Sequence, residues 1–201
     1  MVQVTVKRLF DVLMAAVGLL LLSPLFALVA LAIRCDSRGP VFFRQERMGR
    51  GYRPFQILKF RTMVEDAPSR GGPLTSGRRD PRITRVGRFL RKTKIDELPQ
   101  LVNVLKGEMS LVGPRPEVRK YVDMFREDYG HLLSVRPGLT DLASLTYRDE
   151  AALLSQCEDP EREYVERILP EKIALSRQYV ERMSPWSDVR LIFRTLLSIL
   201  R

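Results

Sequence analysis

The chain has 201 residues, of which 45% are hydrophobic and 29% are charged, and its formal net charge at pH 7 is +10. This is the composition of a folded protein with room for one domain and a membrane element. One histidine, His131, and two cysteines, Cys35 and Cys157, exclude a disulfide framework and do not support a zinc site or a Ser-His-Asp triad. A nucleophile, acid or base is therefore expected among carboxylates, lysines and hydroxyls.

The positive charge is concentrated in one segment. Residues 34–100 contain 17 Lys and Arg against 7 Asp and Glu, whereas residues 101–201 contain 15 against 16. The basic segment follows directly on an apolar one, so it can face anionic lipid headgroups or a phosphorylated substrate. A solvated basic surface without a ligand is the simpler alternative.

Residues 12–33 contain no charged side chain, and three interpretations of them compete. A cleaved signal peptide has a shorter apolar run and a small-residue cleavage site, which "LAIRC" does not provide. A single spanning helix is long enough, since about 20 residues cross the hydrocarbon core. However, Pro24 bends a helix at mid-bilayer. Positive residues at both ends also favour the same cytoplasmic side for both. These flanking residues are Lys7, Arg8, Arg34 and Arg38.

A re-entrant helix-break-helix satisfies both observations. Its arms, residues 12–22 and 25–33, would rise roughly 16 and 14 Å at 1.5 Å per residue. Each arm reaches about half of a hydrocarbon core that is ~30 Å thick. The Ser23 hydroxyl can donate to the backbone carbonyl that Pro24 leaves without a partner. We therefore predict a re-entrant membrane anchor over residues 1–38.

Residues 184–201, "SPWSDVRLIFRTLLSILR", predict a second membrane contact. Ser184 is a suitable N-cap, and Pro185 suits the first helical position. Apolar residues follow at helical spacing, and the arginines lie off their stripe. This pattern is typical of an interfacial amphipathic helix with its tryptophan at headgroup level, and equally of a helix that packs onto the domain core. The stripe consists of Trp186, Val189, Phe193, Leu196, Leu197 and Leu200.

Residues 39–183 are predicted to form one cytoplasmic domain of the α+β class, predominantly helical. The runs "PVFFRQERMG" and "FQILKFRTM" flank a Gly- and Pro-containing turn and predict a small β-hairpin. Residues 65–82 hold three prolines and three glycines and predict a mobile loop. Residues 149–183 predict helices that brace the core.

The most informative segment contains a carboxylate pair, Asp96-Glu97. Asp96 is predicted to cap a helix that runs from Glu97 to about Lys106, with Gly107 as its end. Both carboxylates would then lie at the positive end of the helix dipole, which keeps them ionised and attracts phosphate groups. An ionised Asp can attack phosphorus where cations screen the charge of the substrate. The cations just before the pair are Arg88, Arg91, Lys92 and Lys94.

Arg115 lies between two prolines in "SLVGPRPE". A rigid, extended backbone that presents one arginine suits recognition of a phosphate or a base. Taken alone, however, an Asp-Glu pair at a helix start is commonly only a cap, and Pro-Arg-Pro is a common tripeptide.

Four long stretches resemble the bacterial sugar transferase family, the monotopic polyprenyl-phosphate phosphoglycosyl transferases. They are "KRLFDVLMAAVGLLLLSPLF", "GPVFFRQERMGRGYRPFQILKFRTM", "DPRITRVGRFLRKTKIDELPQLVNVLKGEMSLVGPRPE" and "VRPGLT", in the family's order. The resemblance implies transfer of a phosphosugar from a UDP-sugar to polyprenyl (undecaprenyl) phosphate, with release of UMP and with Mg²⁺ as cofactor. It implies the cytoplasmic face of the inner membrane, the first membrane step of glycoconjugate assembly, and downstream glycosyltransferases as partners.

The resemblance also implies roles for single residues. Asp96 matches the residue that forms a covalent phosphosugar intermediate, and Glu97 matches its partner, which helps to place the metal or to handle protons. Both are therefore candidate Mg²⁺ ligands. The basic positions around the diphosphate and nucleotide correspond to Lys59, Arg91 and Arg115, and Arg88 is grouped with them. The membrane break corresponds to Ser23 and Pro24, and the interfacial basic pair to Lys7 and Arg8.

Two further expectations concern this chain in particular. Arg34 and Arg38, where the anchor meets the domain, are our candidates for binding the phosphate of the polyprenyl phosphate. Asp141 follows Thr140 at a position where family members often have Gly. We therefore expect "DLASLTYRDE" to build a different sugar pocket, which leaves the sugar open.

Two rival functions remain. One is a single-pass membrane protein whose basic face binds anionic lipid or nucleic acid. The charge excess favours it, but the cations surround a carboxylate pair and no aromatic residues interleave with them as in a base-stacking surface, so nucleic acid is not an expected partner. The other is an enzyme in which the lipid phosphate attacks the sugar nucleotide directly, without a covalent stage.

Overall fold

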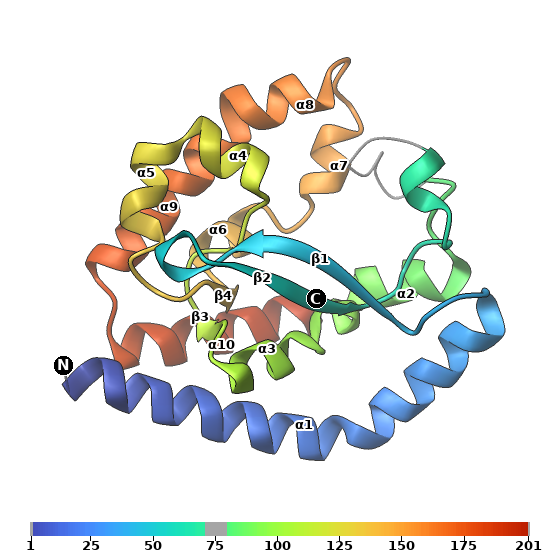
Figure 1. Cartoon of the computed structure of the whole chain (residues 1–201), viewed down its shortest axis with the longest axis horizontal. Helices are drawn as coiled ribbons and strands as arrows, with labels where there is room; N and C mark the ends of the chain where they lie inside the picture. The colour runs from blue at the N-terminus through green and yellow to red at the C-terminus, as the bar shows by residue number, and fades with distance from the viewer. Residues whose placement is uncertain (1, 71–79, 201) are drawn as a thin grey trace.

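The computed structural model describes residues 2–70 and 80–200 of the chain and is predominantly helical, with two small sheets, as expected for the α+β class (Figure 1). Residues 71–79, half of the loop expected over residues 65–82, lie outside the described residues. The elements are α1 (Val2–Asp36), β1 (Phe42–Met48), β2 (Pro54–Phe60), α2 (Arg85–Thr93), α3 (Gln100–Lys106), β3 (Ser110–Val112), α4 (Arg119–Met124), α5 (Arg126–Leu132), β4 (Gly138–Thr140), α6 (Leu142–Thr146), α7 (Glu150–Leu154), α8 (Pro160–Glu163), α9 (Leu169–Glu181) and α10 (Pro185–Leu200).

The N-terminal apolar segment is one continuous helix, α1, with Pro24 inside it. Figure 1 shows that its axis bends near the middle of its length. The Ser23 hydroxyl donates to the carbonyl of Leu20 at 2.8 Å. Leu20 lies four residues before Pro24, so this is the carbonyl that loses its backbone donor to the proline. The expected use of Ser23 is confirmed, whereas the expected break is a bend within one helix.

The two arms of α1 pack against different parts of the domain. Before the bend, Ala15, Leu19 and Leu22 contact a cluster that includes Leu101 and Leu111. After the bend, Leu25, Phe26, Val29 and Ile33 contact Phe60 and Leu90. Both arms therefore lie along the same folded domain, and α1 forms its base (Figure 1).

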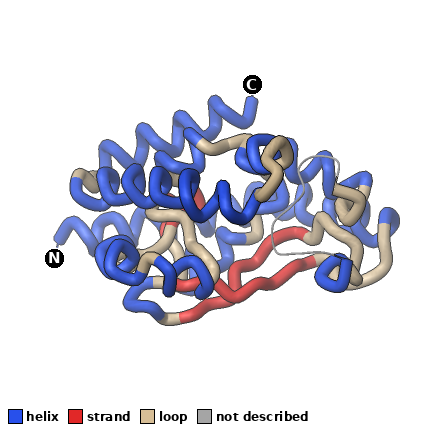
Figure 2. The backbone as a smooth tube through the Cα atoms, turned by 90° about the horizontal axis from the view of Figure 1, so that it is seen from above, coloured by secondary structure: helices blue, strands red, loops and turns tan. Residues whose placement is uncertain are grey.

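The predicted hairpin is confirmed. β1 and β2 pair antiparallel from Phe42–Phe60 to Met48–Pro54, and Figure 2 shows them along one side of the domain, with helices filling the other. A second sheet was not expected: β3 and β4 pair in parallel. Three-residue strands carry too short a pattern to be recognised from sequence. Gly113 and Gly138 permit this pairing, because a Cβ on Gly138 would lie 2.1 Å from the Gly113 nitrogen.

Helices α4, α5 and α9 enclose the remaining core, which contains Tyr121, Leu132 and Ile173. A π-helical turn, Tyr164–Ile168, leads directly into α9. Pro170 is the second residue of α9 and does not interrupt the helical run, because the π-helical turn changes the backbone hydrogen-bond pattern where the proline has no N–H to donate.

α10 turns only one side toward the domain. Leu191 is buried with the cluster beneath β3, and Asp188 is also buried. The apolar stripe expected on this helix points outward instead, with Trp186 exposed to 79% and Phe193 to 62%. Packing of this stripe onto the core, one of the two interpretations, is therefore not observed for the side chains that the structure describes.

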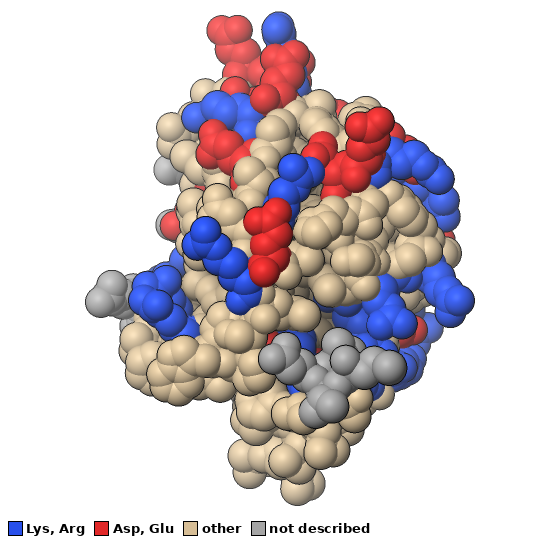
Figure 3. All heavy atoms as spheres, turned by 90° about the vertical axis from the view of Figure 1, so that its left-hand side faces the viewer, with Lys and Arg blue, Asp and Glu red and all other residues tan. Residues whose placement is uncertain are grey.

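The outer side of α1 is likewise apolar. The segment Thr5–Asp36 is long and apolar enough to cross a membrane, with a mean hydropathy of 2.6 in its most apolar stretch, of which only 11% is buried. On the face in Figure 3, the lower end carries no Lys, Arg, Asp or Glu, and basic side chains gather above it. These features point to a membrane location.

Candidate active site

The carboxylate pair lies between α2 and α3, in a 3-10 turn formed by Ile95–Glu97. Lys94 adopts a left-handed conformation (φ 58°) and so turns the chain sharply between α2 and this 3-10 turn. α3 begins only at Gln100, and Asp96 makes no capping hydrogen bond. The expected cap is therefore wrong, because the tighter turn and Pro99 separate the pair from the α-helix. Gly107, with φ 85°, ends α3 as predicted.

Glu97 is the centre of an ion-pair network. Its Oε1 lies 2.8 Å from Nζ of Lys59 and 2.5 Å from Nη2 of Arg115, and its Oε2 accepts a longer bond of 3.3 Å from Nη1 of Arg115. Lys59 comes from β2 and Arg115 from the loop after β3. The fold thus brings three of the predicted site residues into direct contact.

Asp96 and Glu97 have opposite electrostatic surroundings. Burial, together with the charge of Glu97, raises the pKa of Asp96 to about 6. Burial also opposes ionisation of Glu97, but Arg115 and Lys59 outweigh it and hold the pKa of Glu97 well below its usual range. Glu97 therefore stays ionised, and Asp96 is ionised above about pH 6.

Asp96 is 8% exposed, and its buried Oδ1 has no hydrogen-bond partner. A buried carboxylate oxygen normally has one. This atom therefore retains lone pairs that can attack an electrophile or bind a metal ion. The Nε2 of Gln100, four residues further on, is also buried without a partner.

The predicted arginines of α2 have different surroundings. The Nε of Arg91 donates to the Thr62 hydroxyl at 2.8 Å. Burial lowers the pKa of the Arg91 guanidinium, whereas the negative charges of Asp96 and Asp80 raise it. Arg91 therefore lies near the carboxylate pair. Arg88 is exposed and donates to the carbonyl of Ile83. No hydrogen bond or ion pair joins Arg88 to the carboxylate pair in the part of the chain described.

Sequence reasoning missed Asp80 and Arg82, which form a buried ion pair of 2.7 Å beside Arg91. The available signal was the string "DPR" just before α2, because Asp before Pro favours a turn in which the Asp side chain accepts from the backbone nitrogen two residues further on, as Asp80 does from Arg82. This pair lies directly after the undescribed residues 71–79.

Lys7 and Arg8 bind other parts of the protein. Lys7 contacts Asp188 at 2.5 Å, and Arg8 donates to the carbonyls of Val104 and Leu105 at 2.7 and 3.1 Å. Both residues are half-buried, and their role at the membrane interface stays a prediction. These long side chains find acceptors at the C-terminal end of α3 and on α10, because α1 lies against both.

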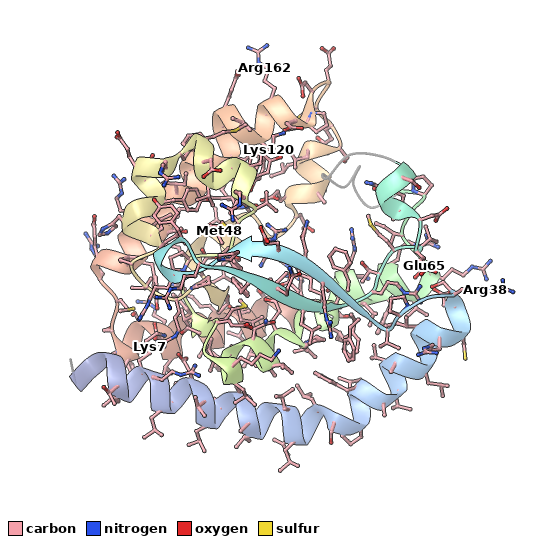
Figure 4. All side chains as sticks on the ribbon, in the orientation of Figure 1. Lys7, Arg38, Met48, Glu65, Lys120 and Arg162 are labelled. Atoms are coloured by element: carbon pink, nitrogen blue, oxygen red, sulfur yellow. The ribbon has the colours of Figure 1, made fainter. Side chains whose placement is uncertain are left out.

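Arg34 and Arg38 are exposed at the far end of α1 from Lys7, as Figure 4 shows for Arg38 beside Glu65. No described contact joins either arginine to the carboxylate pair. Their position beside the apolar helix is as expected, but they lie apart from the ion-pair network.

Asp141 faces inward and is fully buried. It accepts hydrogen bonds from the Ser144 nitrogen (2.7 Å), the Ser176 hydroxyl (3.1 Å) and the Arg115 nitrogen (3.3 Å). The cavity that it lines has a volume of about 20 Å³, which is room for one water molecule and not for a sugar. Asp141 therefore caps α6 and supports the Arg115 loop, and the sugar pocket expected over "DLASLTYRDE" stays a prediction.

No group of three or more Asp, Glu, His or Cys side chains within reach of one metal ion occurs among the described residues. A hard cation such as Mg²⁺ nevertheless binds through one or two carboxylates together with substrate phosphates and water. The free Oδ1 of Asp96 and the weakly bonded Oε2 of Glu97 fit this kind of site.

Comparison with known proteins shows the family of the chain. A sequence model of the bacterial sugar transferase family matches residues 2–201. The chain is 43% identical, over 96% of its length and 69% of the relative's, to the UDP-glucose:undecaprenyl-phosphate glucose-1-phosphate transferase of Caulobacter vibrioides. It is 40% identical, over 97% and 44%, to the UDP-N-acetylgalactosamine-undecaprenyl-phosphate N-acetylgalactosaminephosphotransferase of Aeromonas hydrophila. It is 35% identical, over 96% and 84%, to the exopolysaccharide production protein ExoY of Rhizobium meliloti.

The chain therefore belongs to the bacterial sugar transferase family. It spans less than half the length of the Aeromonas relative.

Proposed function

We propose that this protein is a phosphoglycosyl transferase that moves a phosphosugar from a UDP-sugar to undecaprenyl phosphate or a similar polyprenyl phosphate. The observation that carries the proposal is the buried, unpaired Oδ1 of Asp96 beside a network of cations. The names of the relatives support both substrate classes. They differ in the sugar, so the donor sugar of this chain is left open.

The first step forms a covalent intermediate. Oδ1 of ionised Asp96 attacks the phosphorus that carries the sugar, the bond from this phosphorus to the bridging oxygen breaks, and UMP leaves with the electron pair. The product is an aspartyl phosphosugar. In this proposal Arg91 and Arg115 offset the negative charge that builds up on the phosphoryl oxygens.

The second step transfers the phosphosugar to lipid. An oxygen of the polyprenyl phosphate attacks the same phosphorus, and Asp96 leaves as a free carboxylate, so the enzyme returns to its starting state. No proton has to be moved in either step. Glu97, which is held ionised by Lys59 and Arg115, acts in this scheme by orienting these two cations and not by carrying protons.

We propose Mg²⁺ as the cofactor, because the diphosphate of the donor and the departing UMP are negatively charged. Asp96 and Glu97 would hold it together with donor phosphate oxygens, and it would supply positive charge for the departing UMP. Lys59, Arg91 and Arg115 remain the charges that this chain itself supplies.

We further propose that the protein is monotopic on the cytoplasmic face of the inner membrane. Both arms of α1 pack on the same domain, and a helix bound in this way at both ends does not leave one end on the far side of a bilayer. The exposed apolar stripe of α10 then lies in the interface, and Arg34 and Arg38 stand where a lipid phosphate enters. This packing gives no support to the single-pass rival.

The test is UMP release by detergent-solubilised protein with polyprenyl phosphate, Mg²⁺ and a panel of UDP-sugars. We expect lipid-dependent release from one donor, loss of release in Asp96→Asn, and label from a radioactive sugar phosphate trapped on the protein when lipid is absent. Release that requires lipid but leaves no label on the protein would favour direct attack.

A separate variant tests the lipid site. The double variant Arg34→Gln/Arg38→Gln is expected to raise only the KM for polyprenyl phosphate. An unchanged KM for this lipid would show that the two residues are not part of the lipid site.

A further inference from the structure

Helix α1 contributes two carboxylates to the folded domain, one on each side of its bend. Asp11 is 2% exposed and accepts hydrogen bonds from the Ser110 hydroxyl (2.8 Å) and the Leu111 nitrogen (3.2 Å). Asp36 accepts one from the Val86 nitrogen at 2.9 Å. Each carboxylate therefore binds a segment of the domain that is distant in the sequence.

The Asp36 bond fixes the start of α2. Val86 is in the first turn of this helix, where backbone N–H groups have no acceptor within the helix. The Thr84 hydroxyl accepts from Gly87, and Asp36 supplies the second acceptor together with a favourable negative charge. Arg91, a cation of the proposed site, lies on the same short helix.

The Asp11 bonds fix β3. This strand is followed at once by Gly113, Pro114 and Arg115, and the glycine lies tightly against Gly138. A proline on each side of Arg115 leaves the backbone little freedom to absorb a displacement. The position of β3 therefore determines the position of Arg115, which donates to Glu97, whereas Arg91 lies near Asp96.

The packing of α1 separates these two attachments. The arm with Asp11 contacts the cluster of Leu101 and Leu111, and the arm with Asp36 contacts the cluster of Phe60 and Leu90. Pro24 and the bend lie between them. A change in the bend consequently moves α2 and β3 relative to each other.

We propose that α1 fixes the spacing between Arg91 and Arg115 across the carboxylate pair, with Asp11 and Asp36 as positioning residues. The inference rests on the proposed function and extends it: the membrane helix sets the affinity for the sugar nucleotide as well as holding the protein in the bilayer.

The kinetic test compares Asp36→Ala with Asp36→Asn, because Asn keeps an oxygen that accepts from Val86 and Ala does not. For Asp36→Ala we expect the KM for the UDP-sugar to rise about five- to tenfold, as one lost capping bond allows. Flotation with vesicles should not change, and Asp36→Asn should restore the donor KM. Both variants remove a negative charge beside Arg34 and Arg38, so any change in the KM for polyprenyl phosphate should be the same in the two. Asp11→Ala is expected to act in the same way. Asp123→Ala, an exposed residue on α4 paired only with Arg126 among the contacts described, is the control.

A second measurement does not depend on activity or on one variant folding well. Nitroxide labels at Lys92→Cys on α2 and Arg119→Cys at the start of α4, in a background of Cys35→Ser and Cys157→Ser, report the distance between α2 and the chain four residues after Arg115. We expect one narrow distance distribution, and a broader or shifted one in Asp36→Ala and in Pro24→Ala. An unchanged donor KM and an unchanged distance in these variants would overturn the inference and leave the proposed function standing. A protein without UMP release would overturn the proposed function, while the distance would still test the spacing.

Discussion

Asp96 and Glu97 are neighbours in the sequence, yet their surroundings move their pKa values in opposite directions. Lys59 and Arg115 donate to the carboxylate of Glu97, whereas the buried Oδ1 of Asp96 receives no hydrogen bond. A buried, incompletely solvated carboxylate costs stability, and this cost is typical of a site that is kept reactive.

The first prediction concerns stability. The folded-state pKa of Asp96, about 6, is above its unfolded value of 3.8, so its ionisation makes the folded protein less stable as pH rises from about 4 to about 6. Asp96→Asn removes this cost, and we expect it to raise the free energy of unfolding at pH 8 by up to about 3 kcal/mol, with no gain at pH 4. Denaturant unfolding at both pH values measures this.

Glu97→Gln is the matched variant, and we expect it to lower the free energy of unfolding at pH 8, whereas Asp96→Asn raises it. It leaves Lys59 and Arg115 partly buried without a counter-charge, which costs about 3 kcal/mol at pH 8. Because the pKa of Glu97 is lowered in the folded state, the wild-type advantage should disappear as pH falls below about 4.5. Equal destabilisation by both substitutions would contradict the assignment of a strained Asp96. For wild-type activity, kcat/KM should rise with pH through about 6 and then level off.

At the scale of elements, the site is made from short segments that are held by close backbone approaches. The parallel pair of β3 and β4 carries Arg115 at its end, and the two strands meet at Gly113 and Gly138. Strands of three residues are too short to show a periodic sequence pattern, so they are recognised only in the folded structure.

The second prediction tests this contact. Gly138→Ala places a methyl group against backbone that cannot move aside, and we expect a loss of about 3 kcal/mol in the free energy of unfolding together with a higher KM for the UDP-sugar. Gly51→Ala is the control. Its φ of +66° is unfavourable for Ala, but no atom lies within 4 Å of the new Cβ, so a loss of only about 1 kcal/mol is expected. Gly138 does not have a positive φ, so similar losses at the two positions would show that the strand contact relaxes around the methyl group and would contradict the prediction.

At the scale of the whole molecule, the lower end of the face in Figure 3 is apolar, and basic and acidic side chains lie above it. α1 lies along the base, and both of its ends contact the same domain. This arrangement motivates the third prediction, on orientation.

Two native residues are probes of the proposed orientation. With Cys157→Ser, Cys35 at the end of α1 is the only thiol, and a Thr5→Cys/Cys35→Ser/Cys157→Ser variant moves the thiol to the other end. An impermeant maleimide should label both thiols from the cytoplasmic side only. Trp186, the single tryptophan, should shift its fluorescence to shorter wavelength when anionic vesicles are added. Labelling of the two thiols from opposite sides would establish a spanning helix.

Much of this protein follows from short-range chemistry and is therefore readable in the sequence. The hairpin, the end of α3 at Gly107 and the bond from Ser23 to Leu20 depend on the backbone preferences of neighbouring residues. The carboxylate pair and its cations are recognisable because charge and motif spacing do not depend on the fold.

The tertiary structure alone decided which distant groups meet. Lys7 bonds to α10, Arg8 bonds to α3, and Asp141 supports the Arg115 loop. The pairing of Glu97 with Lys59 and Arg115 likewise required three separate segments to converge. The physical reason is that the partner of a long charged side chain is set by whatever lies within a few ångströms of its tip. This partner comes from a segment distant in the chain, so the residues adjacent in sequence do not identify it.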